Sequence, residues 1–417
     1  MTLFARAHYI IHRLLLESSS NELLSTIQVD IESRKGSLEA ISANLENILY
    51  PWLKPTFSSI LQMQQSLIKN STGIVIPCGD RHFYVTTHLI LSLRRIFKIN
   101  LPVEVYYAGD RDLSQAKINS LSRLLNVRVI NLHNSFPLET RRGESWSYKP
   151  FTLLASNFSK ILFMDSDIAF FRPPLEILES QRFQKNKLLF YRDRKLWVDN
   201  GGGGTNGAFL LHEMNPHMSN YAYSGAYAQS VFDGIRGTTD EMESGFFAVD
   251  KSDTGVFFSL LFAAKLNSKE EREQFYKASY GDKESFWFAT EALRVPYAFN
   301  PSYGGSIGIK GASSGENGYT QVCEGHLLHS NEQNQPFWMH GGSVLGSWYM
   351  TVTPENLDFA EFNWMAFHYK WELQDQIWKD GMNCIEQKTS RTAEIADEEM
   401  ALIEEYRDLF RELKVVQ

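Results

Sequence analysis

Residues 161–171 read ILFMDSDIAFF. The apolar residues that precede Asp165 predict a strand that is buried on both faces, as in the middle of a parallel sheet. Asp165 and Asp167 are two positions apart, so in an extended chain their side chains project to the same side. Two buried carboxylates side by side are unfavourable unless a cation compensates their charge, and oxygen ligands suit hard divalent ions. The stretch therefore predicts a strand that ends at a metal site for Mn²⁺ or Mg²⁺.

The alternative is that two acidic residues stand this close by chance. Asp110 and Asp112 have the same spacing, but they follow Gly109 and precede a polar segment, which is typical of an exposed turn that leads into a helix. The apolar residues on both sides distinguish the pair at Asp165 and Asp167. A cation held there could neutralise the charge that develops on a departing nucleotide diphosphate.

The composition is that of a globular chain, long enough for one large catalytic domain with additions. The chain has 417 residues, of which 43% are hydrophobic, and its net charge of −8 argues against nucleic-acid binding. No apolar stretch reaches the ~18 residues that a membrane span needs. Cys78, Cys323 and Cys384 lie far apart, so neither a zinc ribbon nor a disulfide framework is indicated, and one bridge remains possible.

Residues 71–355 are expected to form a catalytic α/β domain. Segments 73–78, 103–107 and 127–130 have strand character and alternate with helical patterns at 84–97 and 114–125, which predicts a parallel sheet. Ligands of such sheets bind beyond the carboxyl ends of the strands. Gly79, Asp80 and Arg81 should therefore lie on the same rim as the acidic pair. Residues 1–70 are expected to form a helical stem, and residues 356–417 a C-terminal helical extension that ends in an amphipathic helix.

Several motifs in a fixed order resemble the fungal α-mannosyltransferase family of the Golgi. They are GIVIPCGDRHF (73–83), LPVEVYYAGDRDLS (101–114), YKPFTLLASNFSKILFMDSDIAFF (148–171), YRDR (191–194), ESGFFAVDKS (243–252) and GDKESFWFA (281–289). The resemblance covers about residues 71–350. It implies a GT-A glycosyltransferase fold, GDP-mannose as donor, a divalent metal and residence in the Golgi lumen. The membrane anchor usual in that family is not seen in this sequence.

The resemblance also implies roles for residues on the rim. Asp167 matches the residue that binds the metal, and Asp165 the residue that contacts both the metal and the nucleotide. Gly79, Asp80 and Arg81 match the turn that meets the nucleotide. Lys149 is expected to steady the diphosphate, although a solvated lysine before Pro150 is an equal alternative.

Three acidic residues and a histidine complete the site that the resemblance implies. Glu243, Asp282 and Glu284 are candidates for contacts with the sugars, but Asp282 could also be only a helix cap. His329 is expected to be the third protein ligand of the metal, with His340 as the second choice. A histidine between apolar residues is also common in a core without any metal.

The predicted function is metal-dependent transfer of mannose, with retention of configuration, from GDP-mannose to a mannose residue of a protein-linked or cell-wall glycan. One alternative is a UDP-sugar-dependent enzyme of the same fold. The other is a glycan-binding protein without catalytic activity. Residues 191–194 (YRDR) are interpreted as a solvated strand end, and the glycine-rich segment 199–205 as a linker.

Overall fold

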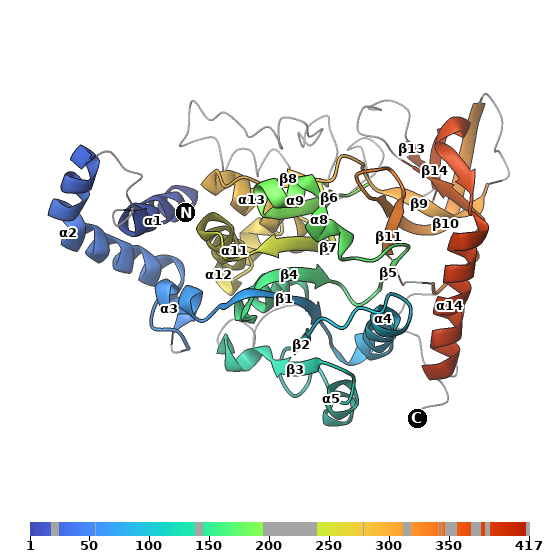
Figure 1. The fold of residues 1–417 in the computed structure, drawn as a ribbon, viewed down its shortest axis with the longest axis horizontal. Coiled ribbons are helices and arrows are strands. Elements are labelled where there is room, and N and C mark those ends of the chain that lie inside the picture. Colours follow the sequence, from blue (N-terminus) through green and yellow to red (C-terminus); the bar gives the residue numbers. More distant parts are fainter. Residues whose placement is uncertain are drawn as a thin grey trace.

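A seven-stranded sheet lies in the middle of the molecule (Figure 1). The computed structural model describes residues 1–17, 25–54, 56–137, 145–194, 240–277, 279–311, 318–340, 342, 344–346, 357–367, 377–379 and 384–413. The strand order is β3-β2-β1-β4-β7-β6-β8. The strands are β1 (Ile68–Pro77), β2 (Val103–Tyr107), β3 (Val127–Asn131), β4 (Phe158–Met164), β6 (Leu188–Arg192), β7 (Met242–Asp250) and β8 (Ala298–Phe299).

The direction of each strand decides which loops meet. Strands β1 to β4 are mutually parallel where they pair, whereas β7 runs antiparallel to both β4 and β6. The carboxyl ends of β1, β2, β4 and β6 therefore share one rim with the beginning of β7. This arrangement confirms the predicted rim and adds β7 to it.

Helices cover both faces of this sheet. One face packs against helices α7 (Lys149–Ala155), α11 (Thr254–Leu266), α12 (Lys269–Phe275) and α13 (Lys283–Leu293), and against the N-terminal helices α1 (Thr2–Glu17), α2 (Ser25–Leu49) and α3 (Ile60–Gln65). The other face packs against α4 (Phe83–Arg95), α5 (Gln115–Ser122), α8 (Glu176–Glu179) and α9 (Gln181–Asn186). Apolar residues fill both interfaces, so the sheet is buried on both sides. The predicted α/β class, with a mostly parallel sheet between helices, is confirmed.

A second, eight-stranded sheet adjoins the first. Its main path is β13-β14-β10-β9-β12-β15, and β11 pairs with both β10 and β5. The strands are β5 (Ile168–Phe170), β9 (Gly305–Lys310), β10 (Tyr319–Ser330), β11 (Pro336–His340), β12 (Trp364–Ala366), β13 (Ile377–Lys379), β14 (Cys384–Lys388) and β15 (Thr392–Glu394). A disulfide between Cys323 and Cys384 joins β10 to β14, so the one possible bridge is formed, and Cys78 is free and buried.

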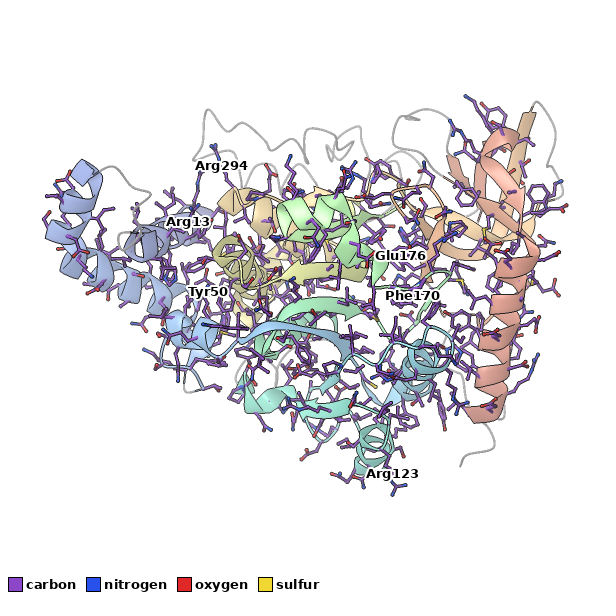
Figure 2. All side chains as sticks on the ribbon, viewed as in Figure 1. Arg13, Tyr50, Arg123, Phe170, Glu176 and Arg294 are labelled. Carbon is purple, nitrogen blue, oxygen red and sulfur yellow. A yellow bond between two sulfur atoms is a disulfide. The ribbon has the colours of Figure 1, made fainter. Side chains whose placement is uncertain are left out.

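The C-terminal helix α14 (Asp397–Leu413) packs against α4 and the second sheet, at the end of the molecule opposite α1 and α2 (Figure 1). The ring of His88 stacks on Phe410 with centroids 3.6 Å apart. The Tyr406 hydroxyl donates to the Phe170 carbonyl at 2.7 Å and accepts from the Phe170 N–H at 3.1 Å. Phe170, labelled in Figure 2, lies in β5, so α14 holds the edge of β5 that β11 leaves open.

The structure corrects one part of the expected domain organisation. The amphipathic C-terminal helix is present, but β12 to β15 fall in the region expected to be a helical extension and pair within the second sheet. The predicted boundary at residue 355 lies outside the described residues, and α1 to α3 precede β1. Among the described helices, none has the length and apolarity needed to cross a bilayer.

Candidate active site

The stretch around Asp165 is divided between the two sheets. Strand β4 ends at Met164, where the Asp165 N–H donates to the Gly245 carbonyl of β7 at 2.7 Å. The chain then turns, and the apolar residues after Asp167 form β5 of the second sheet. Asp165 and Asp167 are only 9% and 7% exposed, so both carboxylates are buried where the sheets meet.

His340 completes a group of possible metal ligands. Pairing of β5 with β11 places His340 opposite Ile168, the residue after Asp167. Ligand atoms of Asp165, Asp167 and His340 all lie within 4.8 Å of one another, and His340 Nε2 is 3.2 Å from Asp167 Oδ1. Two carboxylates and an imidazole that converge in this way fit a divalent transition-metal ion such as Mn²⁺.

His329 does not belong to this group, so the structure does not support it as the third ligand. It lies in β10 opposite Trp338, and its ring stacks on the indole with centroids 4.1 Å apart. Burial lowers the pKa of His329 to about 3. The ring is therefore a neutral part of the core, and the second choice, His340, takes the place expected for the ligand.

His340 lies between two carboxylates, those of Asp167 and Glu243. Its Nδ1 lies 3.0 Å from Oε1 of Glu243, which also accepts from the Gly245 N–H at 2.8 Å. Burial alone would lower the pKa of His340, but Glu243 and Asp167 raise it well above its usual value. Burial would raise the pKa of Glu243, but the charge and hydrogen bond of His340, together with His329 and Lys283, lower it below its usual value. Glu243 thus contacts His340 directly, on the opposite side of the ring from Asp167.

Lys149 is buried beside the acidic pair. Its Nζ donates to Asp165 Oδ2 at 2.7 Å and to Ser244 Oγ at 3.2 Å, and it lies 3.8 Å from Asp282 Oδ1. The alternative of a solvated lysine is therefore wrong. Burial raises the pKa of Asp165 to about 7, although Lys149 and His340 oppose that rise.

The two acidic residues at the start of α13 differ. Asp282 is 3% exposed, and its Oδ2 has no hydrogen-bond partner among the described residues. Glu284 is fully enclosed; it accepts from the backbone N–H groups of Glu241 and Met242 and from the Trp287 indole. Glu284 therefore holds the beginning of β7, which corrects the expectation that it contacts a sugar.

The turn after β1 lies on the same rim. The Asp80 N–H donates to the Asp112 carbonyl at 2.6 Å, and Asp80 Oδ1 accepts from the Ser114 N–H at 2.8 Å. A Cβ on Gly79 would lie 2.6 Å from an Asp112 carboxylate oxygen, so a larger residue at this position would displace that carboxylate. Arg81 is exposed. The nucleotide contacts expected of Gly79, Asp80 and Arg81 stay predictions.

Sequence reasoning missed a buried ionic cluster between β6 and β7. Arg192 pairs with Glu241, and Lys283 Nζ lies 2.7 Å from Asp193 Oδ2 and 2.9 Å from Asp240 Oδ1. The YRDR motif was the available signal, but its alternating charges were interpreted as a solvated strand end. Tyr191, Arg192 and Asp193 are buried instead. The glycine-rich segment 199–205 lies outside the described residues.

Comparisons with known proteins place this chain in a family. Residues 71–331 match the model of a family described as "Mannosyltransferase putative". In Saccharomyces cerevisiae, alpha-1,3-mannosyltransferase MNN1 is 26% identical over 65% of this chain and 41% of its own length. Alpha-1,3-mannosyltransferase MNT2 of the same yeast is also 26% identical, over 65% of this chain and 52% of its own length. The chain thus spans about half the length of these relatives.

A solved structure also overlaps with this chain. It is that of the mannosyltransferase Ktr4p from S. cerevisiae, which is 12% identical. The overlap covers 63% of this chain and 77% of that chain, with a TM-score of 0.36.

Proposed function

The chain belongs to the mannosyltransferase family whose model it matches, and from this premise we propose that it transfers mannose from GDP-mannose to a mannose residue of a glycan. The reaction would depend on a divalent metal, with Mn²⁺ or Mg²⁺ as the ion, and would retain the α configuration. The acceptor would be a protein-linked or cell-wall glycan in the Golgi lumen.

The observation that carries this proposal is the convergence of Asp165, Asp167 and His340 at the carboxyl rim, beside the buried Lys149. A divalent cation bound there would supply positive charge to the departing nucleotide diphosphate. Lys149 would bind the same diphosphate, and its contact with Asp165, one of the proposed metal ligands, supports this role. An ammonium group acts on phosphate oxygens as a compact positive charge.

Other residues of the rim would position the sugar and the metal ligands. The free Oδ2 of Asp282 can accept a hydrogen bond from a hydroxyl of the donor sugar. Glu243 contacts His340 and therefore orients the imidazole, in the way that a carboxylate behind a metal-binding histidine does. Its direct contact with a sugar, expected from the sequence, stays a prediction.

Retention would follow if the acceptor hydroxyl attacks the anomeric carbon from the face that the diphosphate leaves. The bond from carbon to the diphosphate oxygen breaks as the new glycosidic bond forms, and a departing phosphate oxygen takes the hydroxyl proton. The rim would contribute by holding both substrates in that geometry.

A donor screen tests this function. Released nucleotide is measured for GDP-mannose and for UDP-sugars, with Mn²⁺ and mannose oligosaccharides present, together with the melting temperature in GDP or UDP. A ligand that binds the folded state raises the melting temperature according to its affinity. Stabilisation by GDP with transfer of mannose supports the proposal. Stabilisation by UDP alone favours the UDP-sugar alternative, and glycan binding without release or transfer favours a binding protein.

A further inference from the structure

Two exposed aromatic rings meet beside the proposed active site. Among the described side chains after residue 68, the exposed large apolar or aromatic residues are Leu125, Trp146 and Tyr280. Trp146 is 45% exposed and Tyr280 is 64% exposed, and their ring centroids lie 5.8 Å apart at an interplanar angle of 39°. Exposed apolar surface that gathers at one point is typical of a binding site.

Both rings are attached to backbone segments that pack against the folded domain. Trp146 lies in the 3₁₀ helix η4 (Ser145–Tyr148), where the next residue, Ser147, is buried and accepts from Arg272 at 3.1 Å. Tyr280 precedes Gly281, whose φ of +74° favours glycine. A Cβ on Gly281 would lie 3.4 Å from the Trp146 indole, so this backbone packs against the ring. The backbone that carries each ring is therefore anchored to the folded domain.

The ring pair lies close to the reacting groups. Trp146 is three residues before Lys149, which bonds to Asp165 and approaches Asp282 to 3.8 Å. Tyr280 is two residues before Asp282, so their Cα atoms are at most about 7 Å apart. The Lys283 ammonium group lies 5.8 Å from the centre of the Tyr280 ring. A ligand on the two rings would thus be next to the proposed donor sugar.

The chemistry of the pair fits a carbohydrate. A pyranose ring has a face of C–H groups that packs on an aromatic ring, while its hydroxyls reach polar groups at the edge. Trp and Tyr offer both an apolar face and a polar atom at the rim of the ring. We infer that Trp146 and Tyr280 form a subsite for a pyranose ring of the acceptor glycan, next to the mannose that is extended. This inference rests on the proposed function.

The test compares ring removal with ring conservation. Trp146→Ala and Tyr280→Ala should each raise the KM for a mannose oligosaccharide on the order of tenfold, because stacking on the ring is lost. The KM for GDP-mannose and the rate of donor hydrolysis should stay unchanged. Trp146→Phe and Tyr280→Phe should keep most of the affinity for the acceptor, because each keeps a ring. Leu125→Ala, at an exposed apolar residue of another segment, is the matched control and should change neither constant.

Two results would overturn the subsite. A rise in the KM for GDP-mannose, with that for the oligosaccharide unchanged, would mean that the rings bind the nucleotide. Unchanged constants in all ring variants would leave the proposed function intact and remove the subsite alone. If no transfer is detected, binding of α-mannose oligosaccharides is measured directly by calorimetry. Wild-type binding that is lost in Trp146→Ala supports the subsite, and absence of wild-type binding contradicts it.

Discussion

The two sheets contribute to the candidate site in different ways. On the side of the first sheet, Lys149 begins α7 and Asp165 directly follows β4, so both come from one continuous segment of the chain. In the second sheet, His340 reaches Asp167 only because β11 pairs with β5, about 170 positions earlier in the chain. The comparison teaches that the carboxylates of this site are encoded locally, whereas the ligand that completes the group depends on long-range strand pairing.

The largest effect should come from the first sheet. Asp167→Asn removes a negatively charged ligand and should lower metal-dependent transfer on the order of 10³-fold, because stabilisation of the departing diphosphate by the metal is lost. Turnover is measured across a Mn²⁺ titration, and circular dichroism checks the fold. Asp110→Asn, at the exposed member of the other acidic pair of this spacing, is the control and should retain activity. Full activity of Asp167→Asn would exclude a metal site at these residues.

Variants of two histidines in the second sheet test which of them is the metal ligand. His340→Ala should lower the affinity for Mn²⁺ and reduce kcat/KM on the order of 10²-fold, because an imidazole ligand is lost. His329→Ala should instead lower the melting temperature, because it removes a buried ring that stacks on Trp338, and should leave the dependence on Mn²⁺ unchanged. The reverse outcome would restore His329 as the ligand and reject His340.

A smaller effect is expected where α14 supports β5. Tyr406→Phe leaves the buried N–H and carbonyl of Phe170 without their partner, which should cost about 1–3 kcal/mol of unfolding free energy. Because β5 lies between Asp167 and β11, the affinity for Mn²⁺ should also fall severalfold. Tyr276→Phe, which loses a hydrogen bond to Asn267 in another part of the molecule, is the matched control. Equal effects of both variants on Mn²⁺ affinity would contradict a positioning role for Tyr406.

The smallest effect on the metal site is expected for Lys251, which should alter the pH dependence of stability and leave the affinity for Mn²⁺ unchanged. Lys251 is buried at the end of β7 and donates to the carbonyls of Leu153 and Ser156, and burial lowers its pKa to about 7. Between pH 7 and about 10.5 the unfolded chain binds this proton and the folded chain does not. The contribution of Lys251 to unfolding free energy should therefore rise with pH in that window, by at most about 1.4 kcal/mol per unit.

Denaturant unfolding from pH 7 to pH 10 measures this slope. Lys251→Met should flatten it, whereas Lys185→Met, at an exposed lysine, should not. Affinity for Mn²⁺ at pH 7.5 should be the same in both variants, because Lys251 bonds at the opposite end of β7 from Glu243. An unchanged slope in Lys251→Met would mean that this lysine stays charged in the folded protein.

The sequence alone determined the local features of this protein. Apolar runs of strand length that alternate with helical patterns were enough to predict the parallel sheet, because burial of a strand on both faces requires continuous apolar residues. The same reasoning placed Asp165 and Asp167 at the end of β4, since carboxylates interrupt such a run only where something compensates them. The motifs were enough for the family resemblance.

Only the tertiary structure decided between His329 and His340. Both lie in strands with similar neighbours, and the choice depends on the register of β11 against β10 and β5. It also showed that Lys149 and residues 191–193 are buried, because a charged side chain gives no local sign that its partner is supplied by another strand or helix. Contacts between distant segments follow from the packing of the whole chain, and periodicity within one segment does not encode them.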